Sequence, residues 1–146
     1  MKTRTKTYLV FALVLLTWIG CAAKNPTGAR TPENVQVANL SKTLADALRT
    51  GNKTIMQLRD SGKIQQAEVV KLQNYMVVAA KCGKATNAEL ISPDDWPTQK
   101  TKIIQIWTNA GLSNAMASLS PEAGVALQTT VMVVNQIMEA LGGPAI

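Results

Sequence analysis

The sequence offers few side chains of the kinds that catalyse reactions or bind metals. It contains no histidine, which removes the commonest general base, the usual partner of a serine or cysteine nucleophile and most zinc ligand sets. The nine acidic residues are scattered, apart from the adjacent pair Asp94 and Asp95. Acids before a helix usually cap its amides, whereas calcium needs about six to eight oxygen ligands. We therefore expect neither an enzyme nor a metal or other cofactor.

Charge and aromatic content also argue against nucleic acid as a partner. Three of the 15 basic residues stand among the first six positions, so that twelve remain after residue 20, against nine acids, and the net charge falls from +6 to +3. The aromatic residues after residue 20 are only Tyr75, Trp96 and Trp107. A nucleic-acid site needs clustered cations and usually a stacking platform. We expect no nucleic acid partner.

The first twenty residues and the cysteine that follows them are the most informative segment. The sequence MKTRTKTYLVFALVLLTWIG starts with basic residues and continues with an apolar run over 8–19. That run is shorter than the roughly 20 residues that a membrane-spanning helix needs. Small residues and Cys21 follow over 20–23. This order is typical of an export signal peptide, and we assign residues 1–20 to one.

The segment resembles the signal peptide of bacterial lipoproteins, in which a lipobox ends in Gly or Ala followed by Cys. Gly20 and Cys21 match this pattern, Ile19 is compatible with it, and Trp18 stands where the family usually has Leu. The resemblance implies cleavage between Gly20 and Cys21. It also implies a diacylglyceryl thioether on Cys21, whose fatty acids, such as palmitate, insert into membrane lipid. Ala22 in place of Asp implies no retention at the inner membrane of a two-membrane bacterium.

Two other fates of the segment stay open. Cys21 and Ala23 fit the two small residues of an ordinary secretory cleavage site after Ala23, and an uncleaved segment would be a marginal anchor. All three alternatives export the remainder of the chain. Under either cleavage Cys82 has no intramolecular disulfide partner, and its apolar context predicts a small buried side chain.

The remaining chain divides into a tether at residues 21–32 and one domain at residues 33–146. The tether has three Pro or Gly residues and no large apolar side chain, so we expect it to be flexible. From residue 33 apolar residues recur every three or four positions, which predicts an all-α fold. We expect a small antiparallel bundle of four helices, or five if Gly51 divides the first helix.

The predicted helices cover residues 33–60, 65–90, 97–119 and 121–141. Gly62 is expected to end the first one, and Ser120 with Pro121 to begin the last. In the segment ISPDDWPT, over 91–98, Ser92 and the two acids are expected to cap the third helix. Tyr75 is expected at the surface or boundary, and Trp107 in the core. Trp96 is expected to cover the end of the core, with a binding surface for a ligand as the alternative.

Two functions from different classes fit these patterns. The first is a membrane-anchored lipoprotein of the bacterial cell envelope, facing the periplasm or the outside, in which the bundle binds an unknown envelope protein or has a structural role. The second is a soluble secreted or periplasmic carrier of a small apolar ligand. Its cavity would be lined by methionines, which adapt to irregular ligands, namely Met76, Met116, Met132 and Met138.

Overall fold

The computed structural model describes residues 31–116 and 119–146, except for the side chains of residues 114 and 115. Every regular element in these ranges is an α-helix, which confirms the predicted all-α fold. The helices are α2 (Pro32–Asp60), α3 (Gln66–Leu90), α4 (Trp96–Asn109), α5 (Leu112–Met116) and α6 (Pro121–Ala140). No helix within the described ranges is both long and apolar enough to cross a membrane.

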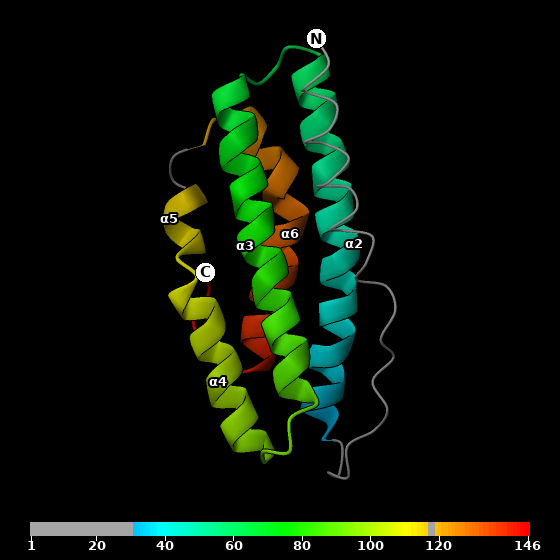
Figure 1. Ribbon diagram of the computed structural model, residues 1–146, viewed down its shortest axis with the longest axis vertical. Helices are drawn as coiled ribbons and strands as arrows, with labels where there is room; N and C mark the ends of the chain where they lie inside the picture. Colours follow the sequence, from blue (N-terminus) through cyan, green and yellow to red (C-terminus); the bar gives the residue numbers. More distant parts are fainter. Residues whose placement is uncertain (1–30, 117–118) are drawn as a thin grey trace.

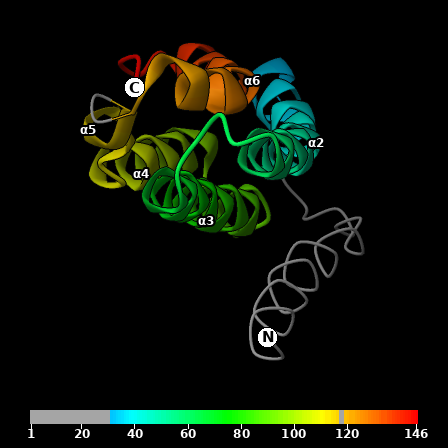
Figure 2. The same ribbon diagram turned by 90° about the horizontal axis from the view of Figure 1, so that it is seen from above.

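The helices form an antiparallel bundle (Figure 1). Helices α2 and α3 run in opposite directions, α4 and α5 together lead back along the bundle, and α6 returns. Viewed from above, α2, α3, α6 and the pair α4–α5 surround a common core (Figure 2). The main packing contacts join α2 to α3 and α6, while α4 and α5 pack chiefly against α3.

Helices α2 and α6 begin at side-chain caps, of which the sequence predicted the one at Ser120. Thr31 Oγ1 accepts a hydrogen bond from the Asn34 amide, 3.3 Å away, at the start of α2. Ser120 does the same for Ala123 at the start of α6. Each cap is followed by a proline at the first helical position, whose fixed φ favours the helix and whose missing N–H is not needed there. These caps fix where α2 and α6 begin.

The prediction of one continuous helix over 97–119 is wrong. Helix α4 ends at Asn109, and Gly111 adopts a positive φ of 66° before the short helix α5 starts at Leu112. Only glycine takes that conformation readily, because it lacks a Cβ atom. The fifth helix of the bundle therefore arises at Gly111 and not at Gly51, where α2 continues without a break.

Gly51 instead lies where α2 packs closely against both α3 and α6. A Cβ atom built on Gly51 would overlap Met76 Cε of α3 and lie 2.9 Å from the backbone oxygen of Ala126 in α6. Real Cβ atoms essentially never approach other atoms so closely. The absent side chain of Gly51 therefore lets α2 pack directly on α3 and α6.

The core contains both expected and unexpected aromatic residues. Trp107 is fully buried, as predicted, and its Nε1 donates to Thr86 Oγ1 at 3.0 Å. Tyr75 was expected at the surface or boundary, but its side chain is only 3% exposed. Burial raises the pKa of Tyr75 to about 12, with a further contribution from Cys82. The prediction for Tyr75 fails because the buried face of α3 is broad enough to include position 75 next to Leu72 and Met76.

Candidate functional site

Trp96, the aromatic residue that the sequence offered as a possible binding surface, begins α4. Its side chain is half-buried and packs against the hydrophobic core. Its Nε1 donates a hydrogen bond to Glu33 Oε2, 2.7 Å away at the start of α2, and Lys100 Nζ lies 4.0 Å from the same oxygen. The indole therefore joins the beginnings of two helices, as expected of a residue that covers the end of the core.

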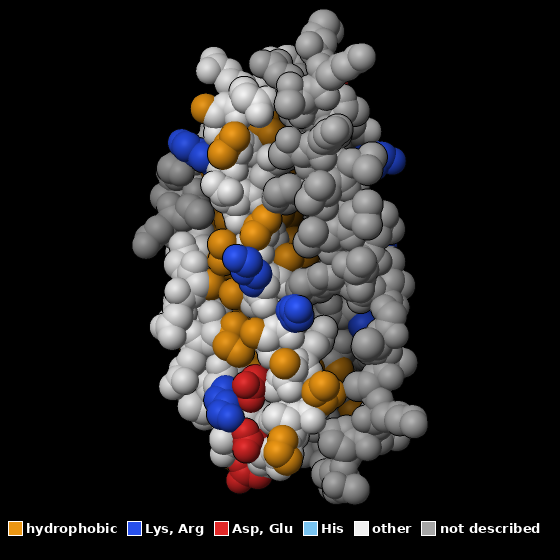
Figure 3. Space-filling view, in the orientation of Figure 1, with side chains coloured by type: hydrophobic (Ala, Val, Ile, Leu, Met, Phe, Trp, Pro, Cys, Tyr) orange, Lys and Arg blue, Asp and Glu red, His pale blue; other side chains and the backbone are white. Residues whose placement is uncertain are grey.

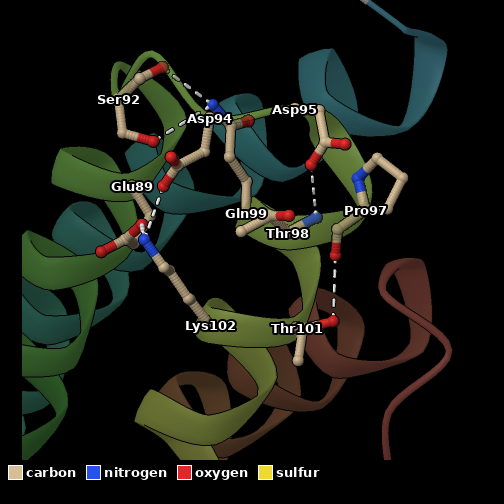
Figure 4. Close-up of polar contacts among 9 residues, drawn as sticks. All are labelled: Glu89, Ser92, Asp94, Asp95, Pro97, Thr98, Gln99, Thr101 and Lys102. Carbon is tan, nitrogen blue, oxygen red and sulfur yellow. Dashed lines mark hydrogen bonds and ion pairs between the residues drawn. The ribbon is translucent and has the colours of Figure 1, made fainter.

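The turn before α4 holds a second polar cluster, in which the two adjacent acids point to different partners (Figure 4). Asp95 Oδ1 accepts from the Thr98 amide at 3.0 Å and caps α4. Asp94 Oδ2 accepts from Lys102 Nζ at 2.5 Å, and Glu89 Oε2 lies 3.6 Å from that nitrogen. Of the expected caps only Asp95 acts as one, because Lys102 reaches back along α4 and engages Asp94.

Ser92, the third expected cap, accepts hydrogen bonds from a buried amide. Gln99 Nε2 donates to the Ser92 backbone oxygen at 3.0 Å and lies 3.4 Å from Ser92 Oγ. Gln99 is itself buried, and such a group needs partners to offset its lost hydration. Ser92 thus holds the turn against α4 (Figure 4).

Electrostatics in this cluster stabilise charged forms. The hydrogen bonds from the Thr98 side chain and backbone hold the pKa of Asp95 below its usual value. The hydrogen bond to Asp94 and the nearby charge of Glu89 raise the pKa of Lys102. Both shifts keep the groups ionised near neutral pH, which suits a structural ion pair rather than a proton-transferring acid or base. Within the described ranges no group of three or more Cys, Asp or Glu is arranged to hold a metal ion.

Glu68 links two helix starts, a role that the sequence did not reveal. Its Oε2 accepts from the Gln65 amide at 3.4 Å at the beginning of α3. Its Oε1 accepts from the Ser120 amide at 3.2 Å, just before α6. A hydrogen bond with the Ser120 side chain is the largest cause of the lowered pKa of Glu68, and the backbone hydrogen bonds with Gln65 and Ser120 lower it further. The contact with Gln65 is readable from their spacing of three residues, whereas the contact with Ser120 spans 52 residues and depends on the fold.

Cys82 lies in the interior, as predicted. Its side chain is 7% exposed, and burial raises the pKa of its thiol. Since the thiolate is the reactive form, this environment makes Cys82 a poor nucleophile. Gly20 and Cys21, the predicted cleavage and lipid-attachment residues, lie outside the described residues, as do the signal peptide and most of the tether.

The four methionines proposed to line a ligand cavity lie in different environments. Met76 and Met138 are core residues, while Met132 is 53% exposed. Met116 borders an open hollow of about 340 Å³ between α5 and α6. The other lining residues come from α6 and are Gly124, Val125, Gln128 and Val131. The four methionine side chains are therefore not gathered around one space.

Comparisons with known proteins do not extend this description, because no protein-family model, no curated protein and no solved structure matches the chain.

Proposed function

We propose that this chain is a membrane-anchored lipoprotein of the bacterial cell envelope, whose helical bundle acts as a binding or structural module for an envelope protein. The observation that carries the proposal is the position of the capped helix α2 relative to Cys21. Thr31 caps α2, and the buried core residues run from Val37 to Leu141. The described residues thus form a buried core of their own, and we take Cys21, which precedes them in the chain, as the site of acylation.

The two cysteines, Cys21 and Cys82, differ in how well they suit acylation. Cys82 is buried with a raised thiol pKa, so it is a poor substrate for a modifying enzyme. Cys21 follows Gly20 in a lipobox-like sequence. Thr31 stands ten positions after Cys21, and a chain of that length spans at most about 35 Å. A lipid on Cys21 would thus keep the bundle close to the bilayer surface.

Several acyl chains together would make this anchoring stable. One chain holds a protein only reversibly, whereas two or more hold it firmly, at about 0.8 kcal/mol per buried methylene group.

We propose no catalytic activity for this chain. The carrier of a small apolar ligand has less support, because the four methionines expected to line its cavity lie apart.

The proposal can be tested with the two cysteines as a matched pair. The full-length chain and its Cys21→Ser and Cys82→Ser variants would be expressed in a bacterium, and membranes would be extracted with a phase-separating detergent. We expect the parent and Cys82→Ser proteins in the detergent phase and Cys21→Ser in the aqueous phase or unprocessed. Equal partitioning of all three proteins would contradict acylation of Cys21.

A further inference from the structure

The outward face of α3 carries a stripe of residues that the bundle leaves exposed. Its members recur every three or four positions, so they lie along one side of the helix. All are exposed except Val77, which is half-buried, and Val70 is 47% exposed. We name this set the α3 stripe: Val70, Asn74, Val77, Lys81, Lys84 and Ala88.

The α3 stripe combines positive charge with apolar surface and contains no acid. The two acids of α3, Glu68 and Glu89, stand near its ends. Each has a partner elsewhere, since Glu68 accepts from Ser120 and Glu89 lies 3.6 Å from Lys102. Neither Lys81 nor Lys84 forms an ion pair with a carboxylate of the described residues. The two ammonium groups are therefore available to anions outside the bundle.

Figure 3 shows this side of the bundle, with α3 in front. Hydrophobic side chains extend along the face and Lys or Arg side chains lie among them. The acidic side chains visible there gather at the end where α3 leads to α4. Lysines beside exposed apolar side chains fit a surface that presents phosphate groups above hydrocarbon, which is the chemistry of an anionic phospholipid bilayer.

We propose that the α3 stripe docks on the anionic phospholipid surface of the membrane that holds Cys21. This inference rests on the proposed function, since the lipid-anchored tether keeps the stripe close to the membrane, which two lysines alone would not do. With at most about 35 Å between Cys21 and Thr31, the stripe meets lipid at high effective concentration. Each lysine near an anionic surface raises the ratio of docked to undocked protein about fivefold. The 25 residues of α3 extend over about 37 Å, so the bundle lies along the bilayer.

The test compares the reactivity of individual lysines in the anchored protein. Mature acylated protein, verified by intact mass, would be reconstituted in vesicles of neutral phosphatidylcholine, with or without anionic phosphatidylglycerol. Labelling with an amine reagent would be followed by peptide mass spectrometry. We expect Lys81 and Lys84 to react several-fold more slowly in the anionic vesicles and to recover in high salt, which screens exposed charges. Lys42 and Lys53, exposed on α2, serve as internal controls and should not change.

A second readout uses charge variants with an environment-sensitive fluorophore on Asn74→Cys, in a Cys82→Ala background. Anionic vesicles should increase its emission in the anchored protein. The double variant Lys81→Gln/Lys84→Gln should lose that increase, and the equally charged control Lys42→Gln/Lys53→Gln should keep it. The ratio of docked to undocked protein is expected to fall by about 25-fold for the first pair, which combines two fivefold effects.

The outcomes separate this inference from the proposed function. Protein without an acyl group would show that the anchor is wrong before any labelling is done. Acylated protein whose four lysines react alike in both kinds of vesicle would overturn lipid docking alone. Protection of Lys81 and Lys84 in native envelope membranes but not in anionic vesicles would also overturn it, because the stripe would then face an acidic protein.

Discussion

The side of the bundle where α2 meets α3 and α6 is built differently from the side formed by α4 and α5. On the first side, α2 runs for 29 residues without a break and Gly51 lets the Ala126 backbone approach. On the second side, the chain turns at Gly111 and α5 has only five residues. An open hollow remains between α5 and α6. The difference teaches that glycine permits close packing inside a continuous helix and ends a helix where φ is positive.

A large effect on stability is expected where the α4–α5 side attaches to the remainder of the bundle. Trp107 is fully buried and donates to Thr86 of α3. Trp107→Ala leaves a cavity and an unpaired hydroxyl, so the free energy of unfolding should fall by about 3–5 kcal/mol. Denaturant unfolding followed by circular dichroism measures this change.

The matched control for Trp107 is Trp96→Ala. Its half-buried ring donates to an exposed carboxylate of Glu33, so we expect a loss of only about 1–2 kcal/mol. Equal losses in the two variants would mean that the rim contact at Trp96 holds α4 as firmly as the core contact does.

The two sides should also respond oppositely to the same small substitution. In Gly51→Ala the new methyl group meets Met76 and the Ala126 oxygen. This overpacking, about 1–3 kcal/mol, should exceed the gain of up to about 1 kcal/mol in helix propensity. In Gly124→Ala nothing lies within 4 Å, so the propensity gain should stand alone and raise the melting temperature. If both variants shift the melting temperature in the same direction, the two sides do not differ in how tightly they pack around these glycines.

A smaller, pH-dependent effect is expected at Glu68, which joins α3 to the start of α6. Its pKa is lowered in the folded protein from an ordinary value of 4.5. A group with a depressed folded pKa stabilises the fold above its unfolded pKa, and this stabilisation disappears as the pH falls through the folded pKa. The pKa of Asp95 is likewise lowered in the folded protein, from an ordinary value of 3.8, so Asp95 stabilises the fold in the same way. Both contributions should therefore be complete above about pH 5 and decline in more acidic solution.

Glu68→Gln isolates the contribution of Glu68 to acid unfolding. The melting temperature of the parent protein, measured between pH 7 and pH 2.5, should fall more steeply below pH 4.5 than that of the variant. Glu122→Gln removes an exposed acid in the first turn of α6 and provides the control. An unchanged slope in Glu68→Gln would show that the hydrogen bond to Ser120 does not contribute to stability.

The sequence predicted the helices well, because their signals are local. The caps at Ser120 and Asp95 and the proline after Ser120 mark helix starts within a few residues. Burial of Trp107 and Cys82 followed from apolar periodicity and context. The break at Gly111 was missed because a glycine in an apolar pattern fits either a helix interior or a positive φ, and the backbone conformation decides between them.

Contacts between distant residues could not be predicted in the same way. The hydrogen bonds of Glu68 with Ser120 and of Trp96 with Glu33 join helices that lie far apart in the sequence. Their formation depends on how the helices pack, and no local pattern encodes it. The α3 stripe is an intermediate case, because its spacing is visible in the sequence, whereas the engagement of Glu68 and Glu89 with other partners is visible only in the fold.

The measurement that tests the central claim most directly is the intact mass of the protein purified from bacterial membranes. The account predicts a chain that starts at Cys21, with a mass larger than that of residues 21–146 by a diacylglyceryl group and any further acyl chain. An unmodified chain that starts at Lys24, or an uncleaved chain from Met1, would contradict the lipid anchor.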